Sequence, residues 1–399
     1  MVVIEVFLFG YFAFCVAYAL LFSIGGLFGV KKIENNFEPK NKFSILIPSY
    51  KEDNVIVSVA KNALNQNYPS ALFDVVIIAD SLQPSTLVQL RALPIRVIEV
   101  FFEKSTKVKA LNEAMLQIGD DYEIGLILDA DNVMEPDFLL KINQAYNAGY
   151  KNIQGRRVAK NTNTDFAKLD ALSEIINNHI YRLGHTALGF SSSLIGSGMA
   201  FEYATLKSTM ANMDSVGGFD RELEVILITK GHKPFYLPTA IVYDEKVEKA
   251  EVFASQRKRW IASQFIYLRK YFFRGFAGLF KGNLVFFNSA ILRNIQLPRV
   301  INLGFLLIIV LVSFVISKHL TISPFYWLLL FIGYIISFIL AVPLSFYDKA
   351  FFNALAKVPQ AFIIMTLALF KLKGANAKFI HTPHGVVTMD SATKTANEK

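Results

Sequence analysis

The sequence predicts an α/β domain, built on a mostly parallel sheet, that is joined to membrane-associated helices. Short apolar segments alternate with helical patterns between residues 41 and 250, and longer apolar segments flank that region. Alternating strands and helices favour a parallel sheet whose two faces are both covered. Hydrophobic residues make up 53% of the 399 residues and charged residues only 18%. This excess of apolar residues predicts burial in lipid.

Residues 2–30 form the first apolar segment, in which Glu5 is the only charged residue. A helix of about 20 apolar residues can cross a bilayer, and the segment lacks the basic start and the cleavage site of a signal peptide. We therefore expect residues 1–30 to be an uncleaved transmembrane anchor. Lys31 and Lys32 follow directly, so the positive-inside tendency predicts an external N-terminus and a cytoplasmic domain after the anchor.

Residues 41–250 are expected to form the globular domain. The predicted buried strands are 43–48, 74–79, 96–100, 125–128 and 152–154. Helical patterns separate them, and in one of these patterns Val55, Val59 and Ala63 share a face. Ligands of such sheets bind outside the carboxyl ends of the strands, and the polar motifs of this chain fall at those ends.

Residues 251–296 combine basic and aromatic side chains, among them Arg257, Lys258 and Trp260. Such a segment is too charged to span a bilayer and too apolar to lie free in solution, which is typical of amphipathic helices in the membrane interface. The formal charge of the chain is +9. Because the basic residues lie beside apolar segments, they favour anionic lipid or a nucleotide diphosphate over nucleic acid. No nucleic-acid partner is expected.

Residues 297–372 are expected to form the C-terminal membrane region. Residues 299–317 and 324–346 are apolar enough to cross the bilayer, whereas 351–370 contains a lysine and a proline and is expected to lie along the interface. Residues 373–399 form a polar tail. With two crossings after the globular domain, the tail would be cytoplasmic.

Acidic residues follow three of the predicted strands. Asp129 and Asp131 end one apolar run, Asp80 ends another, and Glu52 follows the first. Mg²⁺ commonly takes one or two carboxylates together with substrate phosphates, and carboxylates also accept hydrogen bonds from a base or a ribose. These residues predict a nucleotide site with a divalent cation. Taken alone, an Asp-x-Asp pair is equally suited to a turn or a helix cap.

Lys107 and Lys109 lie near the start of the helix that follows strand 96–100. A lysine and the N-terminus of a helix could together attract phosphate. A solvated surface position is the alternative for each lysine.

The order of these motifs resembles glycosyltransferase family 2, and within it the membrane synthases of cellulose, hyaluronan, poly-N-acetylglucosamine and chitin oligosaccharides. The resemblance covers about residues 40–265. It rests on segments 48–52, 129–131, 196–200 and 256–260, and on Asp80; the segment 256–260 fits the pattern Q-x-x-R-W. The resemblance implies a Rossmann-like nucleotide-sugar-binding domain of the GT-A type, a uridine-diphosphate sugar donor and inversion at the anomeric carbon.

The resemblance also implies roles for individual residues. Those expected to bind the nucleotide sugar are Glu52, Asp80, Lys109, Asp129 and Asp131, with Asp131 as the ligand of Mg²⁺ or Mn²⁺. Those expected near the diphosphate and the acceptor are Gly196, Gly198, Gln256, Arg259 and Trp260. A membrane-interface anchor is an alternative role for Trp260.

The expected catalytic base is Asp220. The family usually carries a second acid directly before its base, and here Phe219 occupies that position. Glu222, Leu223 and Gly231 follow Asp220 at the spacing of the family. Glu222 and Glu224 remain alternatives for the base, and an N-cap is an alternative role for Asp220.

The expected function is an inverting glycosyltransferase, integral to a bacterial inner (plasma) membrane, with a cytoplasmic catalytic domain. Its partners would be a nucleotide-sugar donor, a saccharide or lipid-linked acceptor, and the bilayer. Three hypotheses stay open: a polysaccharide synthase that exports its product, a transferase that adds one sugar to a lipid or lipid-linked acceptor, and a catalytically inactive scaffold. Three or four spanning helices leave little material for a channel, which favours a short product or a single transfer.

Overall fold

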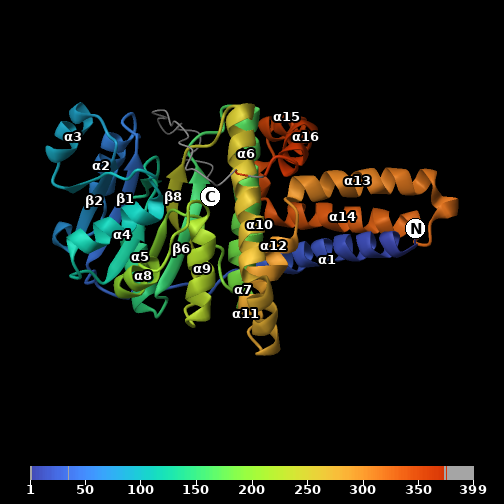
Figure 1. The fold of residues 1–399 in the computed structure, drawn as a ribbon, viewed down its shortest axis with the longest axis horizontal. Helices are drawn as coiled ribbons and strands as arrows, with labels where there is room; N and C mark the ends of the chain where they lie inside the picture. The colour runs from blue at the N-terminus through green and yellow to red at the C-terminus, as the bar shows by residue number, and fades with distance from the viewer. Residues whose placement is uncertain (1, 35, 373, 375–399) are drawn as a thin grey trace.

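The computed structural model describes residues 2–34, 36–372 and 374. Figure 1 shows a sheet with its covering helices at one end of the molecule and a bundle of long helices at the other. The bundle consists of α1 (Val2–Leu27), α13 (Arg299–Val315) and α14 (Pro324–Ala341). Apart from residue 374, the predicted polar tail lies outside the described residues.

Eight strands form one mixed sheet in the order β3-β2-β1-β4-β7-β6-β8-β5. Their bounds are β1 Phe43–Tyr50, β2 Phe73–Asp80, β3 Arg96–Val100, β4 Ile124–Ile127, β5 Val133–Met134, β6 Asn152–Ala159, β7 Met199–Glu202 and β8 Phe235–Asp244. The parallel arrangement predicted from the sequence holds from β3 to β4 and between β6 and β8. The sheet as a whole is mixed, because β7 runs antiparallel to β4 and β6, and β5 antiparallel to β8.

Both faces of the sheet are buried because alternate residues of each strand enter different cores. In β1, Ile45 and Ile47 enter one core and Leu46 the other. The first core is completed by α2 (Ile56–Leu64), α3 (Pro84–Arg91) and α5 (Phe138–Asn147). The second is completed by α4 (Lys107–Ile118), α8 (Tyr203–Met210) and α9 (Phe219–Thr229).

Two long helices separate the sheet from the bundle. In Figure 1, α6 (Asp165–Asn177) and α10 (Ala250–Phe280) run across the direction of the bundle helices. The remaining elements of this layer are η2 Asn178–Gly184, α7 His185–Ala187, α11 Leu284–Phe287, η3 Asn288–Leu292 and α12 Arg293–Ile295.

Among the described residues, α1 and α14 are each long and apolar enough to cross a membrane. Two bent pairs would add a span each if each were counted as one: Leu284–Ile295 with α13, bent by 56°, and α15 (Lys349–Leu355) with α16 (Val358–Leu369), bent by 42°. The predicted span at 299–317 therefore qualifies only as part of a bent pair. The described residues also contain short 3-10 helices at Ser70–Leu72, Ser317–His319 and Leu344–Phe346.

The single charge in the first apolar segment has a structural partner. The Glu5 carboxylate accepts hydrogen bonds from the backbone N–H groups of Thr321 and Ile322, at 3.0 and 2.8 Å. These residues belong to the loop between α13 and α14. Glu5 thus links the first turn of α1 to the loop between α13 and α14.

Candidate active site

A continuous cavity of about 850 Å³ begins at the carboxyl ends of β1, β2 and β4 and continues between α6, α10 and the bundle. Its lining includes most of the site residues predicted from the sequence, namely Glu52, Asp80, Asp129, Asp131, Gly196, Asp220, Gln256, Arg259 and Trp260. Lys109 and Gly198 are not in the lining. Segments that are far apart in the sequence therefore meet at one site, as the strand-end rule predicts.

The ends of β1 and β2 are held in an uncommon backbone conformation. Lys51 and Ser81, the residues directly after these strands, have φ angles of 57° and 59°, in the left-handed region that non-glycine residues rarely adopt. The Lys51 N–H donates to the Asp80 carbonyl at 3.1 Å, which joins the two turns. Glu52 and Asp80 are consequently buried at the rim of the cavity, with 8% and 3% of their surface exposed.

The lysine at the cavity is Lys107 and not Lys109. Lys107 Nζ contacts the Asp129 carboxylate and donates to the Gly196 carbonyl at 2.7 Å. Lys109 Nζ donates to the Lys104 carbonyl at 3.3 Å on the surface. Residues two positions apart on an α-helix point in directions about 200° apart around the helix axis. Only one of the two lysines can therefore face the site.

Asp129 and Asp131 are positioned by a hydrogen-bond chain through Ser197. The Asp129 N–H donates to Ser197 Oγ at 2.9 Å, and Ser197 Oγ donates to Asn132 Oδ1 at 2.6 Å. The Asp131 carboxylate accepts from Asn132 Nδ2 at 3.0 Å. Gly198 follows Ser197 in a conformation that favours glycine: its φ is 61°, and an added Cβ would lie 3.0 Å from Val242. A larger residue at this position would therefore disturb the Ser197 contacts.

The residues around Asp131 are suited to a divalent cation that also binds phosphate. Among the described residues, no group of three or more His, Cys, Asp or Glu side chains could hold a metal ion. Asp129, Asp131 and Asp244 nevertheless all line the cavity. Burial raises the pKa of Asp244, Lys246 and Arg157 act against this shift, and the charge of Asp131 adds to it. One or two carboxylates are enough for Mg²⁺ when phosphates and water supply the other ligands.

A buried ionic network behind Asp244 was not predicted from the sequence. Arg157 pairs with Glu174 at 2.8 Å and with Asp244 at 3.3 Å, and Glu174 also pairs with Arg182 at 2.8 Å. Burial by itself would raise the pKa of Glu174, but Arg157, Arg182 and Lys246 lower it. Asp244 is the last residue of β8, so the rule that ligands bind at the carboxyl ends of strands could have identified Asp244 as a site residue. No sequence pattern marks Arg157 or Glu174.

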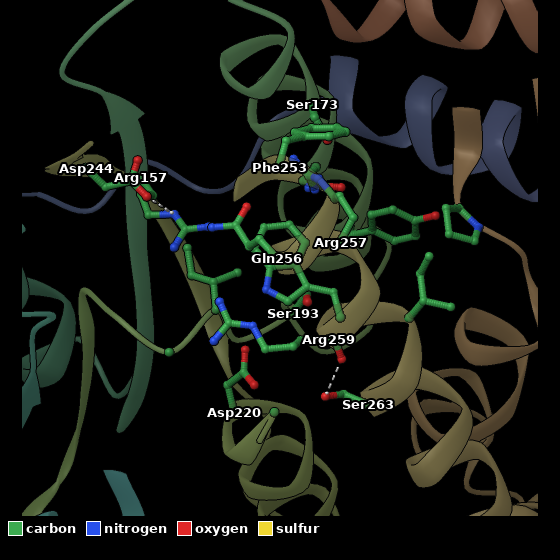
Figure 2. Close-up of a pocket in the computed structure, with 18 of the residues that line it drawn as sticks. Arg157, Ser173, Ser193, Asp220, Asp244, Phe253, Gln256, Arg257, Arg259 and Ser263 are labelled. Carbon is green, nitrogen blue, oxygen red and sulfur yellow. Dashed lines mark hydrogen bonds and ion pairs between the residues drawn. The ribbon is translucent and has the colours of Figure 1, made fainter. Parts of the chain in front are cut away.

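Asp220 lies in the first turn of α9, and α10 packs against the start of that helix. Gly218 precedes the helix with a φ of 69°, and a Cβ added there would lie 2.9 Å from Ser263. The N-cap is therefore Gly218, not Asp220. Burial raises the pKa of Asp220, against the opposing effects of Arg221 and Lys107. Figure 2 shows the Asp220 and Arg259 side chains facing one another in the cavity.

Phe219 replaces the acid that the family usually carries. Its side chain is 8% exposed and belongs to the core beneath α4. Lys107 Nζ lies 5.2 Å from the centroid of its ring, a distance typical of a cation–π contact. At this position the aromatic ring packs beside the lysine that contacts Asp129.

Glu222 and Glu224 do not line the cavity. Glu222 contacts Lys270 and Ser215, which fixes α9 to α10. Glu224 is fully buried and accepts from Ser289 Oγ at 2.9 Å and from Arg293 at 2.7 Å.

The Q-x-x-R-W segment lies on α10, along one wall of the cavity. Figure 2 shows the Gln256 side chain directed toward Arg157, which comes from β6 on the opposite wall of the cavity. Burial lowers the pKa of Arg259. Trp260 is 37% exposed, and its ring covers the Arg257 guanidinium at 4.3 Å from the centroid.

Residues 39–263 match the family described as Glycosyltransferase like family 2. A curated relative from Methanococcus voltae, dolichyl N-acetyl-alpha-D-glucosaminyl phosphate 3-beta-D-2,3-diacetamido-2,3-dideoxy-beta-D-glucuronosyltransferase, is 24% identical over 249 residues, which are 58% of this chain and 76% of the relative. The structure of mannosyltransferase PcManGT from Pyrobaculum calidifontis, in complex with GDP-Man and Mn²⁺, is similar with a TM-score of 0.52 at 13% identity, over 92% of this chain and 97% of that one. Glucosyl-3-phosphoglycerate synthase from Mycobacterium tuberculosis matches with a TM-score of 0.39 at 15% identity, over 55% of this chain and 76% of that one.

Proposed function

This chain belongs to glycosyltransferase family 2 and is a hexosyltransferase, and we propose that it moves one sugar, with inversion, from a nucleotide sugar to a lipid-linked acceptor at the cytoplasmic face of a membrane. The observation that carries the proposal is the single cavity that joins the acidic rim of the sheet to the membrane helices. A donor can bind at the rim while an acceptor reaches the same space from the bilayer. The relative from Methanococcus voltae is named for a dolichyl phosphate-linked acceptor, which supports this choice over a polysaccharide synthase.

In the proposed reaction, the acceptor hydroxyl gives its proton to the Asp220 carboxylate. Its oxygen attacks the anomeric carbon from the face opposite the nucleotide. The new glycosidic C–O bond forms as the bond to the diphosphate breaks, and the nucleoside diphosphate leaves with that bonding pair. A positioned base contributes about 10² to 10⁴ in rate, and Arg259 and Lys107 lie on the cavity wall where they can balance charge on the leaving group.

On the donor side, Glu52 and Asp80 would accept hydrogen bonds from the nucleoside, and Asp129 would face the ribose. A divalent cation held by Asp131, with Asp129 or Asp244 beside it, would neutralise charge on the diphosphate. In the donor complex, Lys107 would take the role that was expected of Lys109. A uridine-diphosphate sugar is the donor that the family resemblance favours.

Transfer can be tested with the purified full chain in detergent, a panel of UDP- and GDP-sugars, and total membrane lipid as the acceptor source. We expect one radiolabelled donor to release its nucleoside diphosphate and to pass a single sugar into the organic phase. A labelled water-soluble polymer would support the polysaccharide synthase instead. Failure to bind or turn over any donor would support the inactive scaffold.

For the membrane topology, we propose an external N-terminus and a cytoplasmic C-terminus. Figure 1 shows the N-terminus and the α13–α14 turn at the same end of the bundle, away from the sheet. Lys31 and Lys32 lie at the opposite end of α1, and Lys371 follows α16. We expect an N-terminal tag to be reachable from outside intact cells and a tag fused after residue 399 to be protected. The opposite pattern, or exposure of both tags, would refute this topology.

A further inference from the structure

We infer that the membrane-side arm of the cavity is a binding site for a lipid phosphate, in which Arg299 and Arg257 hold the phosphate and the bundle holds the apolar chain. The inference rests on the proposed function and specifies the chemistry of its acceptor. The ligand class is a long apolar chain that ends in a phosphate or diphosphate.

The arm is apolar and opens toward the bilayer. It is lined by side chains from α13, α14, α15 and α16, among them Leu303, Ile339, Phe351, Leu355, Val358 and Met365. Ile339 is 55% exposed and Leu355 is 37% exposed. Ile339 and Leu355 therefore lie at the surface of helices that are apolar enough to contact lipid, whereas Phe351 and Met365 lie deeper, at 7% and 5% exposure. A chain in the bilayer could therefore enter sideways, without passing through water.

Arg299 lies where the apolar arm meets the polar part of the cavity. Its Nη2 donates to the Ser173 carbonyl at 3.1 Å, and its guanidinium lies 5.5 Å from the centroid of the Tyr181 ring. Its Nη1 is buried without a hydrogen-bond partner. Within the described part of the chain, no carboxylate forms an ion pair with Arg299 under the 4.0 Å limit that defines one. A guanidinium nitrogen that is buried without a hydrogen-bond partner is costly, and an oxygen of an anionic ligand would remove that cost.

Arg257 is the second cation at this junction. It contacts Asp170, its side chain is 8% exposed, and its Nε is buried without a partner. The positive charge of Arg257 acts against that of Arg299, while Glu174 favours it, and Asp170 pairs with Arg257. Figure 2 shows Arg257 beside Ser173 and Phe253, away from Asp220.

Two guanidinium groups suit a phosphate better than they suit a neutral headgroup. Each presents several N–H donors in a planar fork that matches phosphate oxygens. A phosphate bound here would leave the rest of the acceptor on the Asp220 side of Gln256. The chain, the phosphate and the reacting sugar would then occupy consecutive parts of one cavity.

The test measures binding of tritiated farnesyl phosphate to the purified full chain in detergent, with no donor present. We expect Arg299→Gln to weaken this binding by about 10- to 100-fold, the effect of losing a hydrogen bond between two charged groups. Arg274→Gln, an exposed arginine on α10 outside the cavity, is the matched control and should bind as the parent does. Farnesol, which lacks the phosphate, should bind Arg299→Gln and the parent equally.

A second pair of variants tests the apolar arm independently. Leu355→Trp should block the arm and weaken farnesyl phosphate and farnesol alike. Phe352→Trp, on the same helix at a residue that is 61% exposed and outside the lining, should weaken neither. Competition by dioleoyl phosphatidate as strong as that by farnesyl phosphate would identify a phospholipid headgroup as the ligand; weak competition would identify a single-chain lipid phosphate.

Nucleotide affinity separates this inference from the proposed function. Parent and variants should bind the donor nucleotide with the same affinity, because Arg299 and Leu355 lie away from the strand ends. If the parent turns over a donor but does not bind farnesyl phosphate, or if Arg299→Gln binds it as the parent does, the lipid-phosphate site is refuted while the transferase stands. If farnesyl phosphate binds as expected but no donor is bound or turned over, the proposed function fails and the lipid site remains.

Discussion

Replacing Asp131 with Asn is expected to lower sugar transfer by about 10² to 10³-fold, because Lewis-acid stabilisation by a metal is worth several kcal/mol. The Asn side chain can keep the contact with Asn132 that Asp131 makes at 3.0 Å. It removes the negative charge that we expect to hold the cation. The variant should therefore fold as the parent does. It should bind the nucleotide more weakly than the parent when Mg²⁺ or Mn²⁺ is present, and as the parent does when a chelator has removed the cation.

The measurement is the initial rate of transfer across a titration of Mn²⁺, together with nucleotide affinity in the presence and absence of excess chelator. Asp120→Asn is the matched control, since Asp120 is 79% exposed and pairs with Lys207 on the surface, outside the cavity. The parent should lose its activity in chelator. Full activity of the parent in chelator, or equal rates for both variants, would show that the carboxylates at the end of β4 act without a metal.

The location of the candidate site could be predicted because the sequence shows where strands end. Asp80 follows an apolar run that becomes β2, and Asp129 and Asp131 follow the run that becomes β4. Since β1, β2 and β4 are adjacent and parallel, their carboxyl ends had to meet. The same rule would have found Asp244, had β8 been recognised.

Other parts of the site depend on tertiary packing that leaves no local pattern. The direction of Lys107 and Lys109 depends on the rotation of α4 about its axis, which the sequence does not show. Arg157 and Glu174 pair across β6 and α6, and either residue alone reads as a surface charge. β7 is only four residues long and enters the sheet antiparallel between β4 and β6, so neither its presence nor the mixed sheet could be predicted.

Replacing Asp220 with Asn is expected to lower transfer by about 10² to 10⁴-fold, the usual contribution of a general base. Donor affinity should be unchanged, because the proposed nucleotide contacts come from Glu52, Asp80 and Asp129 at other strand ends. The N-cap of α9 is Gly218, so the substitution removes no cap. The measurement is kcat for transfer beside the affinity for the nucleoside diphosphate.

The pH dependence gives an independent test of the same residue. A base acts as the carboxylate, and burial raises the pKa of Asp220 above its ordinary value. As the pH falls, kcat/KM of the parent should therefore decline at a higher pH than an ordinary aspartate would give. The residual activity of Asp220→Asn should lack this acidic limb.

Glu222→Gln is the decisive control for Asp220→Asn, because Glu222 was the nearest alternative for the base. Its carboxylate contacts Lys270 and Ser215 outside the cavity. The substitution should thus lower the melting temperature while the folded fraction keeps its rate and its acidic limb. If Glu222→Gln abolishes transfer in folded protein and Asp220→Asn does not, the base has moved from Asp220 to Glu222. In that case the Glu222 side chain would have to leave its contacts with Lys270 and Ser215 to reach the acceptor hydroxyl.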